Sequence, residues 1–399
     1  MKILVLNCGS SSIKYKLFDM KSSEVLAQGA IEKIGLKGSF MKFPLPNGDK
    51  VILEGEILEH QAGIEYILGV LTSEKYGCIK SLDEIEAVGH RVVHGGEKFN
   101  NSVLLTDEVI LQVEECIELA PLHNPPNLAG IYAVKELMGD IPQVGVFDTA
   151  FHQTMPPKSY MYGLPYSLYE KYAIRRYGFH GTSHRYVSRK ACELLDVPYE
   201  EQRIISAHIG NGGSLAAIKD GKSIDTTMGM TPVEGLLMGT RSGDVDAGII
   251  SFVMEKENIG TQAISTLVNK HSGLLGISGV SSDMREVQSA MKAGNERAKL
   301  AFDMFEYRIK KYVGAYAAAL GGVDILIFTG GIGENHSISR EIICGNMEYM
   351  GIELDLDKNN EIHGEEAVIS TPNSKVTVIV VPTDEEFMIA SDTMEIAGN

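Results

Sequence analysis

Two arginines set among glycines are the first residues in this chain that could do chemistry. Arg91 lies within residues 89–96 (GHRVVHGG), and Arg241 lies within residues 239–244 (GTRSGD). A guanidinium grips a carboxylate or a phosphate through paired N–H groups, and neighbouring glycines let such an anion approach the backbone. A single arginine of this kind is more simply explained as a surface residue in a loop. Two of them together favour a site that binds anions.

One aspartate and two histidines are further candidates. Asp148 directly follows the apolar run 143–147, a position at which α/β proteins place catalytic or metal-binding carboxylates. His180 lies among glycines and polar residues, and His208 ends another apolar run just before a glycine turn. The alternatives are a helix cap or turn residue for Asp148 and a merely hydrogen-bonded role for each histidine. Since no His/Cys cluster has zinc spacing, a metal here would be a hard cation bound through oxygen and phosphate.

Two glycine-bearing turns repeat one pattern about half the chain apart. Asn-x-Gly-Ser occurs at residues 7–10 (NCGS) and at residues 211–214 (NGGS), each time between an apolar strand and a second strand-like stretch. Backbone N–H groups and hydroxyls of such turns can hold phosphate, so a facing pair predicts a nucleoside triphosphate site. A Walker A motif is not present, because Ala216 stands where its first glycine would precede residues 221–223 (GKS). Residues 330–333 (GGIG) lack the last glycine of a dinucleotide fingerprint, which argues against a nicotinamide enzyme.

The elements that must position these residues alternate between strands and helices. Short apolar runs predict buried strands at residues 2–6, 143–147, 203–207, 324–328 and 375–381. Helices are predicted after the capping residues Thr106, Ser183 and Asn295, the last of them ending at Gly321. The alternation indicates an α/β architecture, and the repeated turn indicates a duplicated domain with a ligand cleft between its halves.

The boundary between the halves is predicted near residue 150. We expect residues 155–176, with tandem prolines and five tyrosines, to form an irregular crossing. The short amphipathic helix predicted over residues 385–397 is expected to pack back on the first half.

The size and charge of the chain limit its function. It has 399 residues and a formal net charge of −17 at pH 7, which argues against a nucleic-acid partner. No apolar run approaches the ~18 residues of a membrane span, and the N-terminal run is too short for a signal peptide. The five cysteines include no CxxC pair, as expected of a reducing compartment. We therefore expect a cytoplasmic protein with neither a nucleic-acid nor a membrane partner.

Two signatures carry a family resemblance. An apolar strand leads into Asn-x-Gly-Ser-Ser-Ser-x-Lys over residues 6–14 (LNCGSSSIK), and a second motif spans residues 205–214 (ISAHIGNGGS). On these motifs the chain resembles, from end to end, the acetokinase (acetate kinase) family of the acetate and sugar kinase, heat-shock chaperone and actin superfamily. The resemblance implies duplicated actin-like ATPase (ribonuclease H-like) domains with an interdomain active-site cleft. It implies an N-terminal acetokinase domain over residues 1–150, with the C-terminal helix of about 385–399 packed on it, and a nucleotide-binding domain over residues 151–384.

The activity implied by the resemblance is reversible, Mg²⁺-dependent, direct in-line transfer of the ATP γ-phosphoryl group to acetate, giving acetyl phosphate and ADP. Mn²⁺ is an alternative ion. The metal would be held by Asn7 and Glu385, with Glu386 as the alternative to Glu385. The nucleotide phosphates would contact Lys14, His208, Ile209, Gly210, Asn211 and Gly212.

The remaining family roles concern the nucleoside, the acetate and the transferring phosphoryl group. The nucleoside would lie against Asp283, Met284 and Arg285, and the adenine pocket would consist of Gly331, Ile332, Gly333, Glu334 and Asn335. Arg91 would bind the acetate carboxylate, and its methyl group would enter a pocket of Val93, Leu122, Phe179 and Pro232. His180 and Arg241 would stabilise the transferring phosphoryl group, with Asp148 as the essential carboxylate. The chain departs from the family's common residues at Asp384, often Asn, and at Met284, often Phe.

The implied substrate needs no general base, because a carboxylic acid is already ionised at neutral pH. The barrier is electrostatic, since two anions must meet and charge spreads over the equatorial oxygens of the phosphoryl group. Arg91, Arg241, His180 and Mg²⁺ meet that need, and we expect Asp148 to orient Arg91 or a metal-bound water rather than to move a proton. The resemblance also implies a homodimer and phosphotransacetylase as the pathway partner.

Three other functions are alternatives. Propionate or butyrate kinase, within the same family, differs by methylene groups that are worth only ~1–3 kcal/mol each in such pockets. An ATP-switched clamp like actin or the chaperones would need an additional surface or domain for which no residues are left. A sugar kinase would need a general-base aspartate and hydrogen-bonding pocket residues, which Val93, Leu122 and Pro232 do not supply. We expect activity on acetate and weaker activity on propionate.

Overall fold

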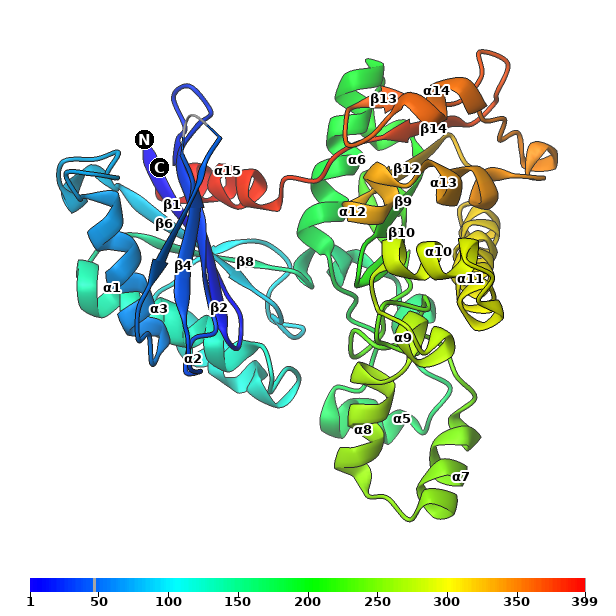
Figure 1. Ribbon diagram of the computed structural model, residues 1–399, viewed down its shortest axis with the longest axis horizontal. Helices are drawn as coiled ribbons and strands as arrows, with labels where there is room; N and C mark the ends of the chain where they lie inside the picture. The colour runs from blue at the N-terminus through cyan, green and yellow to red at the C-terminus, as the bar shows by residue number, and fades with distance from the viewer. Residues whose placement is uncertain (46–47, 399) are drawn as a thin grey trace. The chain divides into compact units, whose positions relative to one another are not determined.

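The computed structural model describes residues 1–45 and 48–398, which form two compact units (Figure 1). Unit 1 consists of Met1–Gln153 together with Asp384–Asn399, and unit 2 is the continuous segment Thr154–Thr383. Unit 1 is therefore assembled from two separate stretches of the chain. Among the described residues, no helix has both the length and the hydropathy required to cross a membrane.

Unit 1 is built on a mixed eight-stranded sheet in the order β5-β4-β3-β2-β1-β6-β8-β7. Its strands are β1 (Lys2–Cys8), β2 (Ser12–Asp19), β3 (Glu24–Glu32), β4 (Phe40–Pro44), β5 (Lys50–Glu54), β6 (Ala87–Val92), β7 (Val103–Leu104) and β8 (Gln143–Phe147). Strands β1, β6 and β8 run parallel, and β2 pairs antiparallel with β1. Strands β1 and β8 are mostly apolar because both faces of this part of the sheet are covered.

Helices cover the two faces of this sheet with separate apolar clusters. On one face, Ile64 and Ile67 of α1 and Val134 of α3 pack with Ile13 and Leu6 of the sheet. On the other face, the C-terminal helix α15 contacts β1, β6 and β8 (Figure 1). The helices of unit 1 are α1 (His60–Leu71), α2 (Asp107–Glu115), α3 (Asn124–Met138) and α15 (Glu385–Ala397), with short 3₁₀ helices η1 (Leu82–Glu84) and η2 (Cys116–Glu118); η3 (Ala150–Thr154) ends where unit 2 begins.

Unit 2 repeats the central strand arrangement of unit 1 in a six-stranded sheet, β11-β10-β9-β12-β14-β13. Its strands are β9 (Arg203–Ile209), β10 (Gly213–Lys219), β11 (Lys222–Thr226), β12 (Ile325–Thr329), β13 (Ala367–Val368) and β14 (Thr377–Val380). In each unit the first three strands are antiparallel neighbours, and two later strands lie parallel beside the first. This shared order confirms the duplicated α/β architecture, with the two Asn-x-Gly-Ser turns at equivalent places, between β1 and β2 and between β9 and β10.

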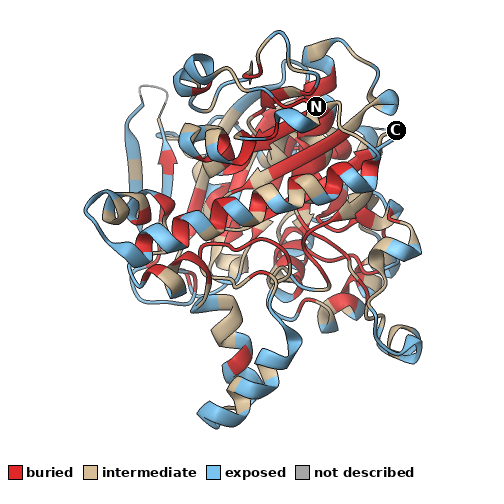
Figure 2. Cartoon of the chain, turned by 90° about the vertical axis from the view of Figure 1, so that its right-hand side faces the viewer, coloured by how far each residue is buried: buried red, intermediate tan, exposed pale blue. Residues whose placement is uncertain are grey.

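The helices of unit 2 include α11, which Figure 2 shows crossing in front of buried strands with one buried and one exposed side. Asn295 caps its first turn, and Gly321 ends it in the left-handed conformation (φ 73°), which confirms both predicted boundaries. The helices are α4 (Pro157–Tyr160), α5 (Tyr166–Tyr172), α6 (Gly181–Leu195), α7 (Ala247–Glu257), α8 (Thr261–Lys270), α9 (Gly273–Ser278), α10 (Met284–Lys292), α11 (Glu296–Leu320), α12 (Gly330–Asn335), α13 (Ser337–Cys344) and α14 (Leu356–Glu361), with η4 (Tyr199–Glu201) and η5 (Glu348–Met350).

Two local predictions were wrong. Ser183 does not cap a helix, because α6 begins earlier, with His180 as its N-cap residue, and the Ser183 hydroxyl contacts Nδ1 of His208 at 2.8 Å instead. Residues 155–176 are not wholly irregular, since they contain the short helices α4 and α5. Helices this short leave no apolar periodicity in the sequence.

Candidate active site

In unit 1, Arg91 and Asp148 lie at the ends of neighbouring parallel strands. Nε of Arg91 donates to Oδ1 of Asp148 at 3.0 Å, and Nη2 donates to Oδ2 at 2.5 Å. Burial alone would lower the pKa of Arg91, but the carboxylates of Asp148 and Glu385 hold it above its usual value. The Asp148 side chain is 2% exposed, so the pair fixes a charged guanidinium at the end of strand β6 in a defined orientation.

Three more predicted residues surround this pair. Oδ1 of Asn7 accepts from Nη1 of Arg91 at 3.1 Å, and Oε2 of Glu385 lies 4.0 Å from Nε of Arg91. Asn7 and Lys14 are opposite one another in the β1–β2 pair. Burial, and then the nearby carboxylates of Asp148 and Glu386, raise the pKa of Glu385 to about 7 despite the opposing effect of Arg91.

This part of unit 1 fits a divalent cation. Its donors are amide and carboxylate oxygens, which Mg²⁺ prefers, and a cation would offset both the burial of the Glu385 carboxylate, which chiefly raises its pKa, and the nearby negative charge of Asp148 and Glu386. Within residues 1–45 and 48–398, no group of three or more His, Cys, Asp or Glu side chains could hold a metal ion by itself. Such a site suits an ion that takes one or two protein ligands and completes its shell with water and phosphate oxygens.

The four residues predicted to surround the acetate methyl group are divided between the units. Val93 of unit 1 is 5% exposed, and its N–H donates to Oδ1 of Asn127 at 3.0 Å, whereas Leu122 is 71% exposed. In unit 2, Phe179 is buried, and the carbonyl of Pro232 lies 3.5 Å from Nη1 of Arg241. Neither unit alone brings all four together.

In unit 2, Arg241 and His180 converge on Gly212. A Cβ atom built on Gly212 would lie 3.3 Å from Nη1 of Arg241 and 3.8 Å from Nε2 of His180. Arg241 forms no ion pair with any described residue; its contacts are a carbonyl at 3.5 Å and the sulfur of Met238 at 3.9 Å. Burial lowers the pKa of Arg241. A half-buried guanidinium without a carboxylate partner, beside a glycine in a turn, is suited to an incoming phosphoryl group.

The predicted phosphate turn lies between β9 and β10. The N–H of Gly210 donates to the carbonyl of Gly212 at 3.0 Å, which closes the turn. His208, at the end of β9, stacks on the ring of His180 with ring centres 4.3 Å apart and planes inclined by 22°. Gly210 and Asn211 line the cavity described next, while His208, Ile209 and Gly212 do not.

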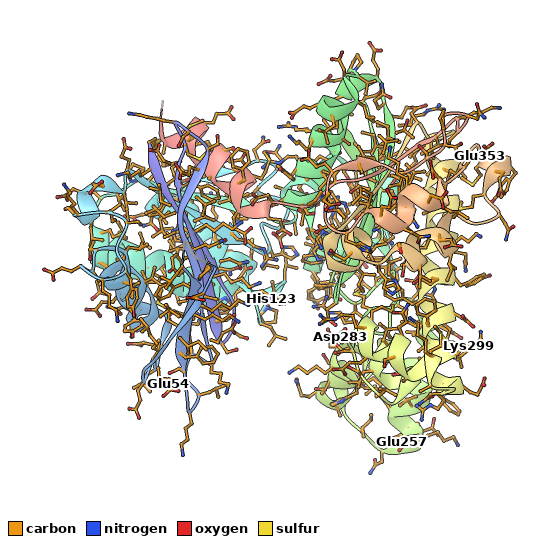
Figure 3. The ribbon with its side chains drawn as sticks, turned by 45° about the horizontal axis from the view of Figure 1, so that its top comes forward. Glu54, His123, Glu257, Asp283, Lys299 and Glu353 are labelled. Atoms are coloured by element: carbon orange, nitrogen blue, oxygen red, sulfur yellow. The ribbon has the colours of Figure 1, made fainter. Side chains whose placement is uncertain are left out.

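The three predicted nucleoside residues and three of the five predicted adenine residues line a single cavity of about 540 Å³ in unit 2. Asp283, labelled in Figure 3, caps α10 and forms a paired salt bridge with Arg285, with atoms 3.0 and 2.6 Å apart, which lowers the pKa of Asp283 to about 2. The lining consists of Gly210, Asn211, Ser282, Asp283, Met284, Arg285, Gly331, Ile332, Asn335 and His336. Ser282 and His336 were not among the predicted residues, although each directly adjoins one that was.

Two of the predicted adenine residues, Gly333 and Glu334, do not line the cavity but form contacts that hold its wall in place. Oε1 of Glu334 accepts from the N–H groups of Gly330 at 2.8 Å and Thr383 at 3.1 Å, so its carboxylate turns back toward the start of α12. The carbonyls of Gly333 and Glu334 accept from Nη1 of Arg340 at 3.0 and 2.8 Å. Arg340 is fully buried, and burial lowers its pKa to about 10. These contacts fix α12, which carries part of the cavity wall.

The sequence prediction did not include the polar residues behind His180. Oγ of Ser214 lies 2.9 Å from Nδ1 of His180 and 2.8 Å from Nε2 of His184. A signal for His184 was present, because it follows His180 by four residues and so lies about one helical turn away. A signal for Ser214 was also present, since it belongs to the second Asn-x-Gly-Ser turn.

Known proteins share this arrangement over the whole chain. Residues 2–391 match the acetokinase family. An acetate kinase of Azobacteroides pseudotrichonymphae is 71% identical over 396 residues, covering 99% of this chain and 100% of that protein. The crystal structure of Porphyromonas gingivalis acetate kinase is 64% identical with a TM-score of 0.97, and a propionate kinase from Francisella tularensis is 42% identical with a TM-score of 0.92; each alignment covers 99% of both chains. The chain therefore belongs to the acetokinase family.

Proposed function

We propose that this chain transfers the γ-phosphoryl group of ATP to acetate, giving acetyl phosphate and ADP. The observation that carries the proposal is the convergence of Arg241 and His180 on Gly212, in a unit that also holds the 540 Å³ cavity. A phosphoryl group at Gly212 would meet a guanidinium and an imidazole where charge accumulates during transfer. Donors placed before the reaction stabilise such charge without reorganisation of solvent.

The acetate carboxylate is assigned to Arg91 in unit 1. Asp148 engages Nε and Nη2 of Arg91, and Asn7 engages Nη1, so the guanidinium approaches its substrate with a fixed plane. Because acetate is ionised at neutral pH, Asp148 has no proton to remove. It acts as the residue that orients Arg91.

Family members are ATP-using kinases that need a divalent metal, and we assign Mg²⁺ here to Asn7 and Glu385, with Mn²⁺ as an alternative ion. The ion would supply neutralisation of phosphate charge. Glu385 binds it as a carboxylate, so the raised pKa of Glu385 predicts that affinity for the ion falls as the pH drops below about 7. Lys14, opposite Asn7 on β2, adds a positive charge for the nucleotide phosphates.

Acetate is preferred over longer acids in this proposal. The acetate kinases of Azobacteroides and Porphyromonas are 71% and 64% identical to the chain, against 42% for the Francisella propionate kinase. One extra methylene changes transition-state binding by only ~1–3 kcal/mol, so propionate should react more weakly rather than not at all.

The test is acyl phosphate formation from Mg-ATP with acetate, propionate, butyrate and glucose in parallel, trapped as hydroxamate, with ADP followed separately. We expect most hydroxamate with acetate and less with propionate. ADP release without hydroxamate from any acid would contradict the proposal and favour an ATP-switched clamp. Greater turnover on propionate or butyrate would reassign the substrate within the family.

We also propose that the chain forms a homodimer in the cytoplasm and supplies acetyl phosphate to a phosphotransacetylase. Helix α7 supports the dimer, because none of its residues is buried, and Ile249 and Phe252 are 47% and 59% exposed. Apolar side chains on an otherwise uncovered helix suit a second copy of the chain. Light scattering after size exclusion should give twice the chain mass, and Phe252→Asp should lower it. A monomeric mass at all concentrations would contradict the dimer.

A further inference from the structure

A continuous row of serine and histidine side chains lies behind His180. Nδ1 of His180 is 2.9 Å from Oγ of Ser214, the same Oγ is 2.8 Å from Nε2 of His184, and Nδ1 of His184 is 2.8 Å from Oγ of Ser206. Ser206, Ser214 and His184 are all 0% exposed. We call this row, from Ser206 through His184 and Ser214 to His180, the relay.

We propose that His184 is a positioning residue that acts through Ser214 to set the tautomer of His180, so that Nε2 of His180 carries the proton facing Gly212. This inference rests on the proposed role of His180 at the transferring phosphoryl group. The relay lies entirely within unit 2, on β9, β10, α6 and the N-cap residue of α6.

The relay has only two consistent proton orders when its histidines are neutral. A serine hydroxyl has one hydrogen, so Ser214 can donate to only one of the two imidazoles and must accept from the other. In the first order, Ser206 donates to Nδ1 of His184, Nε2–H of His184 donates to Ser214, and Ser214 donates to Nδ1 of His180. The proton of His180 is then on Nε2. In the second order every bond is reversed, so the proton of His180 is on Nδ1 and its Nε2 presents a lone pair.

The position of His180 favours the first order. Its Nε2 faces the point beside Gly212 that Nη1 of Arg241 also faces. An N–H there attracts the oxygens of a phosphoryl group, whereas a lone pair would repel them. The ring itself has little freedom to compensate, because the backbone of His180 is held in the left-handed region (φ 56°) and the ring stacks on His208.

The register of the strands explains why these residues meet. Ser206 and His208 are two residues apart on β9, so they lie on the same face of the sheet. Ser214 on β10 is directly opposite His208. Helix α6 packs on β9 and brings His184 to this face, so a single polar side chain of the helix can reach both serines.

The test compares Ser214→Ala and Ser206→Ala with the native enzyme by two-bond ¹H–¹⁵N NMR of histidine-labelled protein, with the His180 signals identified from a His180→Gln sample. In the native enzyme His180 should be the Nε2–H tautomer. Ser214→Ala should produce a tautomer mixture and lower kcat about tenfold or more, with KM for ATP and acetate changed less than about twofold. Ser206→Ala, which leaves the direct contact to His180 intact, should change the tautomer in the same direction but less.

Ser188→Ala is the matched control, since Ser188 is a buried serine one turn further along α6 that contacts the hydroxyl of Tyr199 at 3.0 Å. It should leave both the His180 tautomer and kcat unchanged. An unchanged Nε2–H tautomer in both relay variants would overturn the proposal. A changed tautomer with unchanged kcat would support the relay and contradict the role proposed for His180, so the two failures are distinguishable.

Discussion

Asp148 holds the guanidinium of Arg91 through two parallel hydrogen bonds, at the ends of neighbouring parallel strands. Both carboxylate oxygens are engaged, and the side chain is 2% exposed. A carboxylate in this geometry fixes the plane of its partner, and its lone pairs are directed at the arginine rather than at a substrate proton.

We therefore expect Asp148→Asn to lower activity by disturbing the orientation of Arg91, not by removing a proton acceptor. An amide can accept on one side only, so the guanidinium loses its fixed plane, and a misplacement of about 1 Å can cost a hundredfold in rate. We expect kcat/KM for acetate to fall about a hundredfold in steady-state assays while KM for ATP changes little. Near-native turnover would contradict any need for the charge, and recovery at higher Mg²⁺ would instead assign Asp148 to the metal.

Asp324→Asn provides a control for the loss of a paired carboxylate. Asp324 also engages one arginine twice, with Nε and Nη2 of Arg203 at 2.9 and 2.6 Å, but this pair is partly exposed and lies at the start of β9 and directly before β12. Its loss should cost no more than ~1 kcal/mol of stability and leave turnover unchanged. Comparable losses of activity in the two variants would show that the effect at Asp148 is structural.

Arg241→Ala is expected to remove a donor that acts in the transition state. Removal of one such preorganised donor costs ~2.7–4 kcal/mol, which corresponds to a fall in kcat of at least a hundredfold. Arg297→Ala is the control, because Arg297, like Arg241, donates to backbone carbonyls, here those of Ile277 and Gly276, but lies outside the site. Native kcat in Arg241→Ala would remove this residue from the mechanism.

Gly331→Leu tests the nucleotide cavity without altering a charged group. A Cβ at Gly331 meets nothing within 4 Å, and the residue lines the cavity, so the added side chain should occupy the space proposed for adenine. We expect KM for ATP to rise about tenfold or more, equivalent to ~1.4 kcal/mol, with an unchanged melting temperature. Gly314→Leu, on α11, is a matched control because its Cβ also meets nothing within 4 Å. An unchanged KM for ATP in Gly331→Leu would show that the adenine base of ATP does not bind in this cavity.

We expect Glu306 to make the free energy of unfolding decrease as the pH rises. Its side chain is 1% exposed, Oε1 accepts from the Ser339 hydroxyl, and Oε2 has no hydrogen-bond partner among the described residues. Burial raises its pKa from 4.5 to about 8. Between those values the folded state binds more protons than the unfolded state, so stability decreases by up to ~1.4 kcal/mol per pH unit as the pH rises toward 8.

Glu306→Gln should remove that dependence, which thermal unfolding at pH 5.5 and pH 8 can measure. The melting temperature of the native chain should fall between these pH values by more than that of the variant. Glu296→Gln, at the exposed start of the same helix, should behave like the native chain. Equal pH dependence in Glu306→Gln and the native chain would show that Glu306 is ionised in the folded state.

The elements that the sequence predicted well were those whose signal is local. Strand β8 and helix α15 match their predicted ranges, and Asn295 and Gly321 bound α11 as expected. Each of these elements is marked by a short apolar run or by a capping residue, and both signals lie in adjacent residues of the sequence. The two Asn-x-Gly-Ser turns are also local sequence signals. The duplication inferred from them is confirmed by the shared strand order of the two sheets.

The parts that the sequence did not predict depend on contacts between distant segments. Ser183 has the residue type of a helix cap, but its hydroxyl instead contacts His208 and, at 2.8 Å, Thr383. Arg340 resembles an ordinary surface arginine in sequence, yet it is fully buried among carbonyls of α12 and of residues 359–362. Neither partner set can be deduced from spacing, because tertiary packing of α6 and α13 creates both.

The helix that carries Glu385 has a consequence for the order in which the protein is made. Ile389 and Ala390 of α15 complete an apolar cluster with Ile3 and Val5 of β1, so residues from opposite ends of the chain share one core. A ribosome synthesises the whole of Thr154–Thr383 before it reaches this helix. Unit 2 can therefore fold during translation while one sheet face of the N-terminal segment is still uncovered. The same helix that covers this face delivers Glu385, so the nascent chain acquires its proposed metal ligand only as this core closes.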